Sequence, residues 1–389
     1  MTDSAPPPTL AALAARYDRQ VLDVGRRRAR IRLEGAGDGA WDAVLHDGRA
    51  ELQAANGRAA DAVIRADERT WRKVAADLRG GMEAFRAGRL LVRRDLHLGV
   101  GFLAATSAPD DGERRLRFVP VRTAAGEIST MQAGDGPPVV MLHGLGATKA
   151  SFLPTVAALA DRHRAIAIDL PGFGDSSKPL RAPYHAPWFA RAVVDLLDSL
   201  ELERADVIGN SMGGRVAIEL GLRHPERVRR LALLAPSLAW LRDRPWAPLL
   251  RLVPPQLGAI QPAPRPLVEA IVRRAIPGAG DGWTAAGVDE FLRSYLTPAG
   301  RAAFYAAARN IYLEEPHGEK GFWTRLPRLE PPALFVWGRQ DQLVPARFAR
   351  HVRAALPAAE HLELSCGHVP QLEQPQATHD AIRRFLRRR

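Results

Sequence analysis

The chain has 389 residues, of which 46% are hydrophobic and 25% are charged, and its single cysteine is Cys366. This length exceeds that of one small module, the composition is that of a globular protein, and one cysteine excludes an internal disulfide and a cysteine-based zinc site. The net charge of +12 comes mostly from arginines scattered along the chain, so we expect no nucleic-acid partner, and no pattern predicts a metal or a cofactor.

The first 14 residues contain an acidic residue and the run Pro6-Pro7-Pro8, where a secretory signal has a basic head and an apolar stretch. We expect this segment to be disordered. No apolar run approaches the roughly 20 residues that span a bilayer, so we expect a soluble, cytoplasmic protein. The arginine-rich tail carries Ile382, Phe385 and Leu386 on one side of a helix, and a weak contact of this helix with a membrane surface is kept as an alternative.

Residues 15–106 have the pattern of a small α+β domain, followed by a polar linker at 107–114. Asp47-Gly48 predicts a hairpin turn, and Asp67 can cap a helix that contains Trp71 and Val74 at helical spacing. Alternating apolar positions predict strands at 29–34, 41–46, 50–53, 62–64 and 90–92, before a closing helix around 96–103.

The phrase GMEAFRAGRLLVRRDLHLGVGFLAA, at residues 81–105, resembles the sterol-carrier-protein-2 (SCP2) type of lipid-binding domain. Members of that family place an F-x-x-G-[KR]-L strand before a final helix over a lipid tunnel. The resemblance covers residues 15–106 and implies a bound lipid or acyl chain. Many members have Gly-Asp after the strand, where this chain has Arg94-Asp95. A filled core would give the same apolar pattern as a tunnel, so both alternatives stay open.

From residue 115 onward, short apolar strands alternate with helical stretches, as in a mostly parallel sheet covered by helices. The first three of these strands end in turns that contain glycine, and ligands of such sheets bind beyond the carboxyl ends of the strands. We expect these turns to converge on one site. The strands are predicted at 139–142, 165–168, 205–208, 231–234, 333–337 and 362–364.

The sequence Gly209-Asn210-Ser211-Met212-Gly213 fits the G-x-S-x-G turn, which projects a nucleophilic serine from a sheet. Gly209 and Gly213 are expected to allow the strand and the helix to pass closely. A strand precedes the turn and a helix at 215–223 follows it, which favours a nucleophile over a serine that only caps the helix. We therefore predict Ser211 as the nucleophile.

A serine nucleophile needs a histidine base and a carboxylate that orients the histidine. Asp341 lies in the turn after the strand at 333–337, and His368 follows the last strand. The chain order Ser211, Asp341, His368 is the order expected for this type of sheet. The alternative for Asp341 is an ordinary turn residue, and the alternative for His368 is a histidine without a catalytic role.

The oxyanion that forms on a substrate carbonyl needs two hydrogen-bond donors. We predict the backbone N–H of Met212, which follows the serine, and that of Leu145 in the sequence His143-Gly144-Leu145-Gly146. His143 and Gly144 are predicted to be structural residues of this loop. The glycine-rich turn at 169–176 is predicted to be a scaffold that walls the pocket.

The phrases HGLG, DLPGFGDS, GNSMGG, WGRQDQLVP and CGHVPQLE together resemble the α/β-hydrolase superfamily over residues 115–389. The resemblance implies Ser211 as nucleophile, Asp341 as acid and His368 as base, and a serine at 211 disfavours the members that use an aspartate nucleophile. It also implies that the insert at about 237–328 is a helical cap. This insert contains Trp240, Trp246, Trp283 and Trp323, which either fill the cap's own core or face an apolar substrate.

The expected architecture is an α/β-hydrolase fold with a mostly parallel sheet and a helical cap, preceded by the small SCP2-like domain. The predicted function is that of a serine esterase or lipase-like hydrolase acting on a small apolar or lipid-like substrate. One alternative is hydrolysis of a carbon–carbon bond in a ring-cleavage product. Those enzymes often carry an extra Gly-Pro in the first loop and a Trp where this chain has Val369, so esters are favoured. A lipid carrier without catalysis is the alternative of another class.

Overall fold

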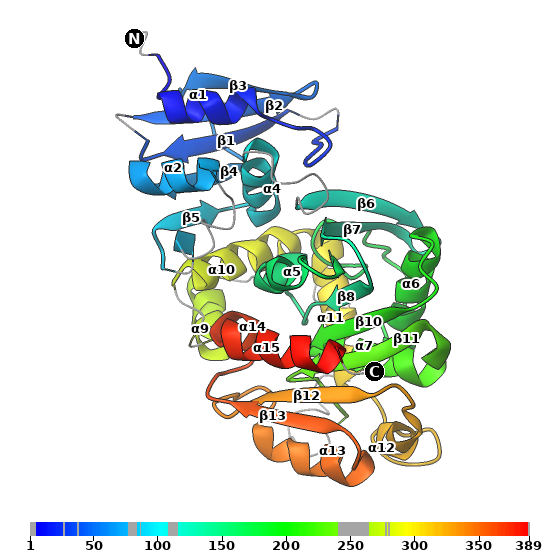
Figure 1. Ribbon diagram of the computed structural model, residues 1–389. Helices are drawn as coiled ribbons and strands as arrows, with labels where there is room; N and C mark the ends of the chain where they lie inside the picture. The colour runs from blue at the N-terminus through cyan, green and yellow to red at the C-terminus, as the bar shows by residue number, and fades with distance from the viewer. Residues whose placement is uncertain are drawn as a thin grey trace.

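Two sheets organise the chain in the computed structural model (Figure 1), one of five strands and one of eight. The structure describes residues 5–25, 28–36, 39–76, 84–85, 87–107, 116–239, 264–276, 278 and 281–387. Most of the predicted linker, residues 108–114, lies outside the described residues, as do Trp240 and Trp246.

The N-terminal sheet has the order β3-β2-β1-β4-β5, with β1 and β4 parallel and its other neighbours antiparallel. The hairpin between β2 and β3 turns at Asp47 and Gly48, which have φ angles of 48° and 74°. The five predicted strands are confirmed, because their alternating apolar residues face one core. The strands are β1 (Ala29–Glu34), β2 (Ala40–His46), β3 (Arg49–Ala54), β4 (Ala62–Ala66) and β5 (Leu90–Arg93).

Three helices pack on this sheet: α1 (Pro8–Ala15), α2 (Glu68–Ala76) and α4 (Leu96–Thr106). The predicted disorder of residues 1–14 is wrong for the part that forms α1. Pro8 occupies the start of this helix, where proline is tolerated, and Leu10 and Leu13 are 1% and 0% exposed. The prolines therefore mark the beginning of a helix that is held by its buried leucines.

The larger sheet has the order β13-β12-β11-β10-β8-β9-β7-β6. The strands from β8 to β13 run parallel, while β7 pairs antiparallel with β9 and with β6. The six predicted strands are present, whereas β6 and β7 were not predicted. The strands are β6 (Arg117–Thr123), β7 (Gly126–Ala133), β8 (Pro138–Leu142), β9 (Arg164–Ile168), β10 (Ala205–Asn210), β11 (Val228–Leu234), β12 (Ala333–Gly338) and β13 (Glu360–Leu364).

Helices cover this sheet, with α6 packed on α7 and α15 packed on α5. Short 3-10 turns precede several of them, including η2 (Lys149–Phe152) before α5. The helices are α5 (Leu153–Leu159), α6 (Ala186–Ser199), α7 (Met212–Arg223), α13 (Ala349–Ala355), α14 (Pro370–Glu373) and α15 (Pro375–Leu386).

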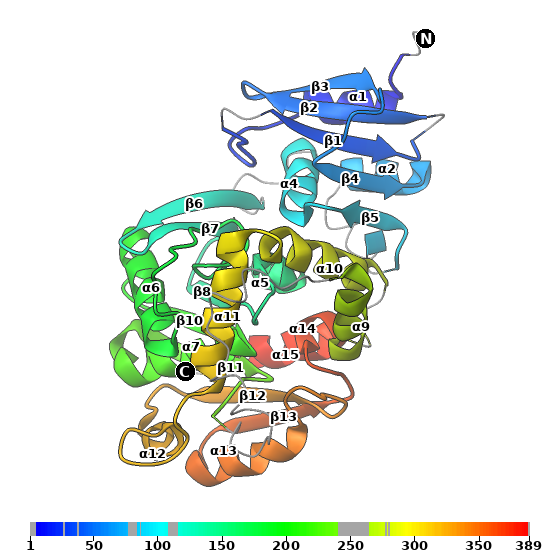
Figure 2. The ribbon, with the colours of Figure 1, turned by 180° about the vertical axis from the view of Figure 1, so that it is seen from behind.

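The described part of the insert between β11 and β12 is helical, as predicted. Its helices are α9 (Arg265–Ala275), α10 (Asp281–Tyr295), α11 (Pro298–Tyr312) and α12 (Phe322–Arg325). Figure 2 shows α11 and α10 in front of the larger sheet, with α10 running below β5 of the N-terminal sheet. The insert therefore lies between the two sheets as well as over one of them.

The apolar side of the C-terminal helix is buried in the protein. Ile382, Phe385 and Leu386 are 0%, 4% and 8% exposed and belong to the hydrophobic core. The helix packs this apolar face on α5. A contact of the arginine-rich tail with a membrane surface stays an untested alternative. Among the described residues, no helix is long and apolar enough to cross a membrane.

One hydrophobic cluster extends across both sheets. We call the five-stranded sheet with α1, α2 and α4 the N-terminal unit. The cluster contains Leu10 and Trp71 in this unit, Phe118 and Met131 in β6 and β7, and Leu386 at the end of α15. Helix α4 lies between the N-terminal sheet and the larger sheet (Figure 1), and it is buried almost along its whole length. The two sheets thus share core residues rather than meeting through a solvated gap.

A buried histidine helps to hold α15 on α5. The Nε2 of His379 lies 3.0 Å from the Oγ1 of Thr155. Burial, together with the charge of Arg383, lowers the pKa of His379 from 6.5 to about 4. A histidine with a lowered pKa in the folded state stabilises that state fully above its unfolded pKa, and this contribution is lost as the pH falls from 6.5 towards 4.

We therefore expect the free energy of unfolding of the wild-type protein to fall more steeply with acid than that of His379→Gln. The expected additional loss between about pH 7.5 and about pH 5 is about 2 kcal/mol, because glutamine takes up no proton on unfolding. Urea unfolding at both pH values measures this difference. Equal losses in the two proteins would contradict the assignment of a neutral buried His379.

Candidate active site

Ser211 lies at the turn where β10 runs directly into α7. Its φ and ψ are 53° and −115°, a strained conformation for a residue with a side chain, and it is 3% exposed. A Cβ on Gly209 would lie 2.4 Å from the carbonyl oxygen of Gly213, and a Cβ on Gly213 would lie 2.0 Å from that of Leu142. Only glycine fits at these two positions, so the turn has the geometry of a nucleophile elbow.

Asp341 and His368 are in direct contact, with 2.7 Å between Asp341 Oδ2 and His368 Nδ1. They follow β12 and β13, which are parallel neighbours. The Asp341 side chain is fully buried, and its Oδ1 accepts the N–H groups of Leu343 and Val344, each at 2.8 Å. A carboxylate held in this way accepts the Nδ1–H of His368 and leaves Nε2 as the basic nitrogen of the ring.

Asn210 connects the turn that carries Ser211 to the loop after β13 that carries His368. Its Nδ2 donates to the carbonyl of Leu234 at 3.0 Å and to the carbonyl of His368 at 3.1 Å. The structure thus brings Asp341 and His368 together, and it places Ser211 next to the asparagine that binds the backbone of His368. All three predicted residues lie at the carboxyl edge of the larger sheet.

The loop after β8 lies against the serine, since a Cβ on Gly144 would stand 3.2 Å from the Cβ of Ser211. His143 in this loop is fully buried. Its Nδ1–H donates to the Gly144 carbonyl at 2.7 Å, and its Nε2 accepts the N–H of Leu170 at 3.0 Å. Burial lowers the pKa of His143. Both ring nitrogens of His143 bind backbone groups, so the residue ties two loops together.

The two predicted oxyanion donors belong to the segments on either side of Ser211. Met212 is the first residue of α7 and is buried. The first N–H groups of a helix have no partner within the helix, and they carry partial positive charge. Leu145 follows Gly144 in the loop that touches the serine, and it is half-buried.

A buried ion pair that the sequence analysis missed supports this loop. Lys149 and Asp169 are 2% and 0% exposed, with 2.6 Å between Nζ and Oδ2, and the Lys149 N–H donates to Oδ1 at 2.7 Å. Burial opposes the charge of Lys149, but Asp169 and Asp175 raise its pKa overall. The chain has only four lysines, so a lysine just after the HGLG phrase was a usable signal.

The turn at 169–176 is built around the same aspartate. Asp169 Oδ2 accepts the N–H of Asp175 at 2.9 Å, and the Asp169 carbonyl accepts the Ser176 hydroxyl at 2.6 Å. Leu170 in this turn donates its N–H to His143. These contacts give the turn the scaffold geometry that was predicted for it.

Aromatic side chains of the insert lie against the loop after β8. A Cβ on Gly146, which has a φ of 73°, would stand 2.8 Å from the ring of Phe291 and 3.1 Å from that of Phe304. The two rings meet edge to face, with 5.6 Å between their centroids. The ring of Phe291 also stacks on Tyr295 at 4.9 Å. Helices α10 and α11 thus rest directly on the loop that carries Leu145.

The two described tryptophans of the insert pack on residues outside the predicted catalytic set. Trp283 meets the ring of Phe85 in the N-terminal unit at a centroid distance of 4.8 Å. Trp323 packs on Phe322 and donates its Nε1–H to the Ala239 carbonyl at 3.2 Å. Neither contact involves a residue of the predicted catalytic set.

Within the described ranges of the chain, no group of three or more His, Cys, Asp or Glu side chains is arranged to hold a metal ion. Cys366 is buried close to the histidine loop, and burial raises the pKa of its thiol to about 12. A thiol with this pKa stays protonated and is a poor nucleophile. Ser211 is therefore the side chain at this edge that is best placed to attack a substrate.

A strained serine on an elbow and a carboxylate-bound histidine define a site of the serine-hydrolase type. The family model of the alpha/beta hydrolase fold matches residues 137–375. The chain therefore belongs to the α/β-hydrolase fold family.

Relatives of the chain include a methyl ester esterase and a semialdehyde hydrolase. The pimeloyl-[acyl-carrier protein] methyl ester esterase of Aeromonas hydrophila is 31% identical over 263 residues, covering 67% of this chain and 99% of the relative. The 2-hydroxymuconate semialdehyde hydrolase of Pseudomonas sp. strain CF600 is 29% identical over 270 residues, covering 65% of this chain and 88% of the relative. A bacterial membrane phospholipase A structure superposes with a TM-score of 0.58 at 28% identity, covering 70% of this chain and 86% of that one.

Proposed function

We propose that the protein is a serine hydrolase that cleaves a carboxylic ester of an apolar substrate through an acyl-enzyme. The observation that carries the proposal is the 2.7 Å contact between His368 Nδ1 and Asp341 Oδ2, at the sheet edge where Ser211 occupies its strained turn. The contact supports the proposal because a carboxylate bound to Nδ1 leaves Nε2 as the nitrogen that would accept a proton from the serine hydroxyl.

In the proposed reaction, Ser211 Oγ attacks the ester carbonyl and its proton passes to His368 Nε2. The N–H groups of Leu145 and Met212 stabilise the negative oxygen of the tetrahedral intermediate. When the carbon–oxygen bond to the alcohol breaks, His368 gives the proton to the leaving alkoxide. Water then attacks the acyl-enzyme with His368 as base, which releases the acid and restores Ser211.

The apolar character proposed for the substrate is supported by the insert. Phe291 and Phe304 lie over Gly146, next to the proposed oxyanion donor Leu145. These rings offer an apolar surface beside the reacting carbonyl. The similarity to the pimeloyl-[acyl-carrier protein] methyl ester esterase also supports an ester substrate.

Hydrolysis of a carbon–carbon bond is the second candidate. It is favoured by the similarity to the 2-hydroxymuconate semialdehyde hydrolase, and the same serine and histidine would serve it. The two candidates differ in the group that leaves, which is an alkoxide for an ester and a carbanion for a ring-cleavage product.

The test offers purified full-length protein p-nitrophenyl acetate, butyrate, octanoate and palmitate, and separately a 2-hydroxy-6-oxo-dienoate whose cleavage bleaches its absorbance. We expect turnover of the esters, with the highest kcat/KM at an intermediate or long chain, because the rings over Gly146 are apolar. Turnover of the dienoate alone would select the second candidate. Turnover of neither would favour the lipid carrier.

For residues 15–106 we propose an SCP2-type fold. The proposal is supported by the order of elements, since β5 is followed at once by α4. A second support is the backbone at Arg94, whose φ of 74° lies in the left-handed region. Glycine adopts this region without strain, and many SCP2 members have a glycine at this position. A bound lipid in this unit stays a prediction.

A further inference from the structure

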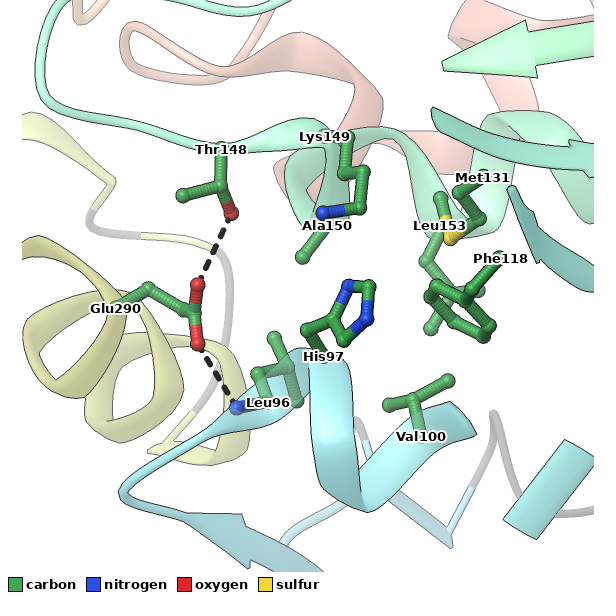
Figure 3. A pocket seen from close by; sticks show the side chains of 10 residues that line it. All are labelled: Leu96, His97, Val100, Phe118, Met131, Thr148, Lys149, Ala150, Leu153 and Glu290. Carbon is green, nitrogen blue, oxygen red and sulfur yellow. Dashed lines mark hydrogen bonds between the residues drawn. The ribbon is translucent and has the colours of Figure 1, made fainter. Parts of the chain in front are cut away.

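Glu290 in α10 bridges the N-terminal unit and the loop after β8. Its Oε1 accepts the N–H of Leu96 at 2.8 Å, and its Oε2 accepts the hydroxyl of Thr148 at 3.3 Å (Figure 3). Leu96 is the first residue of α4, while Thr148 lies two positions beyond Gly146. Glu290 is 4% exposed, so both contacts are made inside the protein.

The preceding residue, Asp289, holds the same helix to β5. Its Oδ2 accepts the Nε of Arg93 at 2.7 Å and the backbone N–H of Arg94 at 2.8 Å. Its Oδ1 accepts Nη2 of Arg265, at the start of α9, at 2.5 Å. The Asp289 carboxylate is buried, while Arg93 and Arg265 are partly exposed, and these partly buried ion pairs tie two helices of the insert to the N-terminal unit.

The next residue, Phe291, faces the loop itself. A Cβ on Gly146 would lie only 2.8 Å from the Phe291 ring. The backbone at Gly146 is therefore in close contact with α10. At the other end of α10, a Cβ on Gly282 would lie 2.1 Å from the carbonyl oxygen of Phe85 in the N-terminal unit. Three consecutive residues of α10 thus contact, between them, both the N-terminal unit and the loop after β8.

Charged groups surround this junction. Arg293 of α10 donates to Asp175 at 2.6 Å and to Glu290 at 3.0 Å. Asp175 also lies 3.2 Å from Lys149 Nζ and 3.2 Å from His97 Nδ1. These ionic contacts therefore connect α4, α10, the turn at 169–176 and Lys149, which follows Thr148.

A small pocket lies beside Glu290, bordered by apolar side chains from α4, β6, β7 and α5 (Figure 3). These elements also share one hydrophobic cluster. The hydrogen bonds of Glu290 therefore act together with apolar packing at this junction.

We propose that the N-terminal unit positions the loop after β8, which carries the proposed oxyanion donor Leu145. Glu290 and Asp289 are the positioning residues. Residues 93–96 hold α10 through the two carboxylates, and α10 holds residues 144–148 through Thr148 and Gly146. The inference rests on the proposed function, because the loop matters for the rate only if Leu145 binds an oxyanion. It gives the N-terminal unit a role that requires no bound lipid.

The variants are Glu290→Gln, Asp289→Asn and Thr148→Val, and the matched control is Asp42→Asn. Thr148→Val removes only the hydroxyl donated to Glu290 and keeps the shape of the side chain. Asp42 is likewise a buried carboxylate between two arginines, at 2.8 Å from Arg30 and 2.9 Å from Arg32, and it lies in β2. Asp42→Asn therefore tests the loss of a buried carboxylate–arginine interaction within the N-terminal unit, away from α10.

The first readout is hydrogen–deuterium exchange of the backbone amides of residues 143–149 in the full chain, which requires no substrate. We expect faster exchange of this peptide in the three variants than in wild type, and unchanged exchange in Asp42→Asn. Unchanged exchange in all three variants would overturn the inference. Equal acceleration in Asp42→Asn would also overturn it, because the effect would then be a general loss of stability.

The second readout is the split between kcat and KM for p-nitrophenyl butyrate. Loss of an oxyanion donor costs about 10²- to 10³-fold in kcat, and a displaced donor should cost about 10- to 100-fold, at nearly constant KM. A raised KM at constant kcat would overturn the positioning role. If wild type hydrolyses no ester, the proposed function fails, while the exchange measurement still decides whether the N-terminal unit holds the loop.

Discussion

Replacing Ser211 by alanine is expected to lower kcat for p-nitrophenyl butyrate by about 10⁶-fold, to the level left by the oxyanion donors and substrate binding. Alanine has no hydroxyl to form the acyl-enzyme, and the Cys366 thiol, which follows β13 at the same edge of the sheet, is buried with a pKa raised to about 12. Initial rates with wild type and variant at saturating ester measure the effect.

Ser199→Ala is the matched control, because the Ser199 hydroxyl only donates to the Asp195 carbonyl within α6. We expect this variant to keep the wild-type rate. A fluorophosphonate should label the wild-type protein on the peptide that contains Ser211, as read by mass spectrometry. Labelling at another serine, or ester turnover that survives in Ser211→Ala, would overturn the proposed mechanism.

Replacing Asp341 by asparagine is expected to lower kcat by about 10⁴-fold while leaving the fold intact. The two N–H groups of Leu343 and Val344 both donate to one oxygen, so the amide oxygen of asparagine must take that place. The amide NH₂ then faces His368 Nδ1, which must accept a hydrogen bond. The ring proton moves to Nε2, and the nitrogen that should accept the serine proton is already protonated.

The measurement for Asp341→Asn combines kcat with thermal unfolding. We expect the large loss of rate with a small change in melting temperature, since the backbone contacts of the turn are kept. His368→Gln offers a comparison, because it removes the base itself and should lose at least as much. A loss below tenfold in Asp341→Asn would mean that this carboxylate does not orient the base.

Much of the fold was predictable because its signals are local. The strands at 29–34 and 205–208 stand out by their apolar residues, and the G-x-S-x-G turn is a short motif with a steric cause. β6 and β7 escaped prediction because Pro120 and several polar residues interrupt their apolar pattern. Helix α1 was misjudged because prolines that begin a helix resemble prolines of a disordered tail.

The predicted catalytic residues come from motifs, whereas their supports come from distant parts of the chain. Asp289 and Glu290 look like ordinary charged residues of an exposed helix, which is what most such residues are. Their partners Arg93 and Leu96 lie in another unit, and nothing local links them. Contacts between segments so far apart become visible only when the two sheets are placed together.

The hydrophobic cluster that runs from Leu10 through Met131 to Leu386 has a consequence for how the protein denatures. Two units with separate cores could melt independently, but units that share a core lose it together. Damage confined to the N-terminal sheet should then lower the heat tolerance of the catalytic half as well. Tolerance of the chain to substitution is thus limited by the weaker of the two sheets.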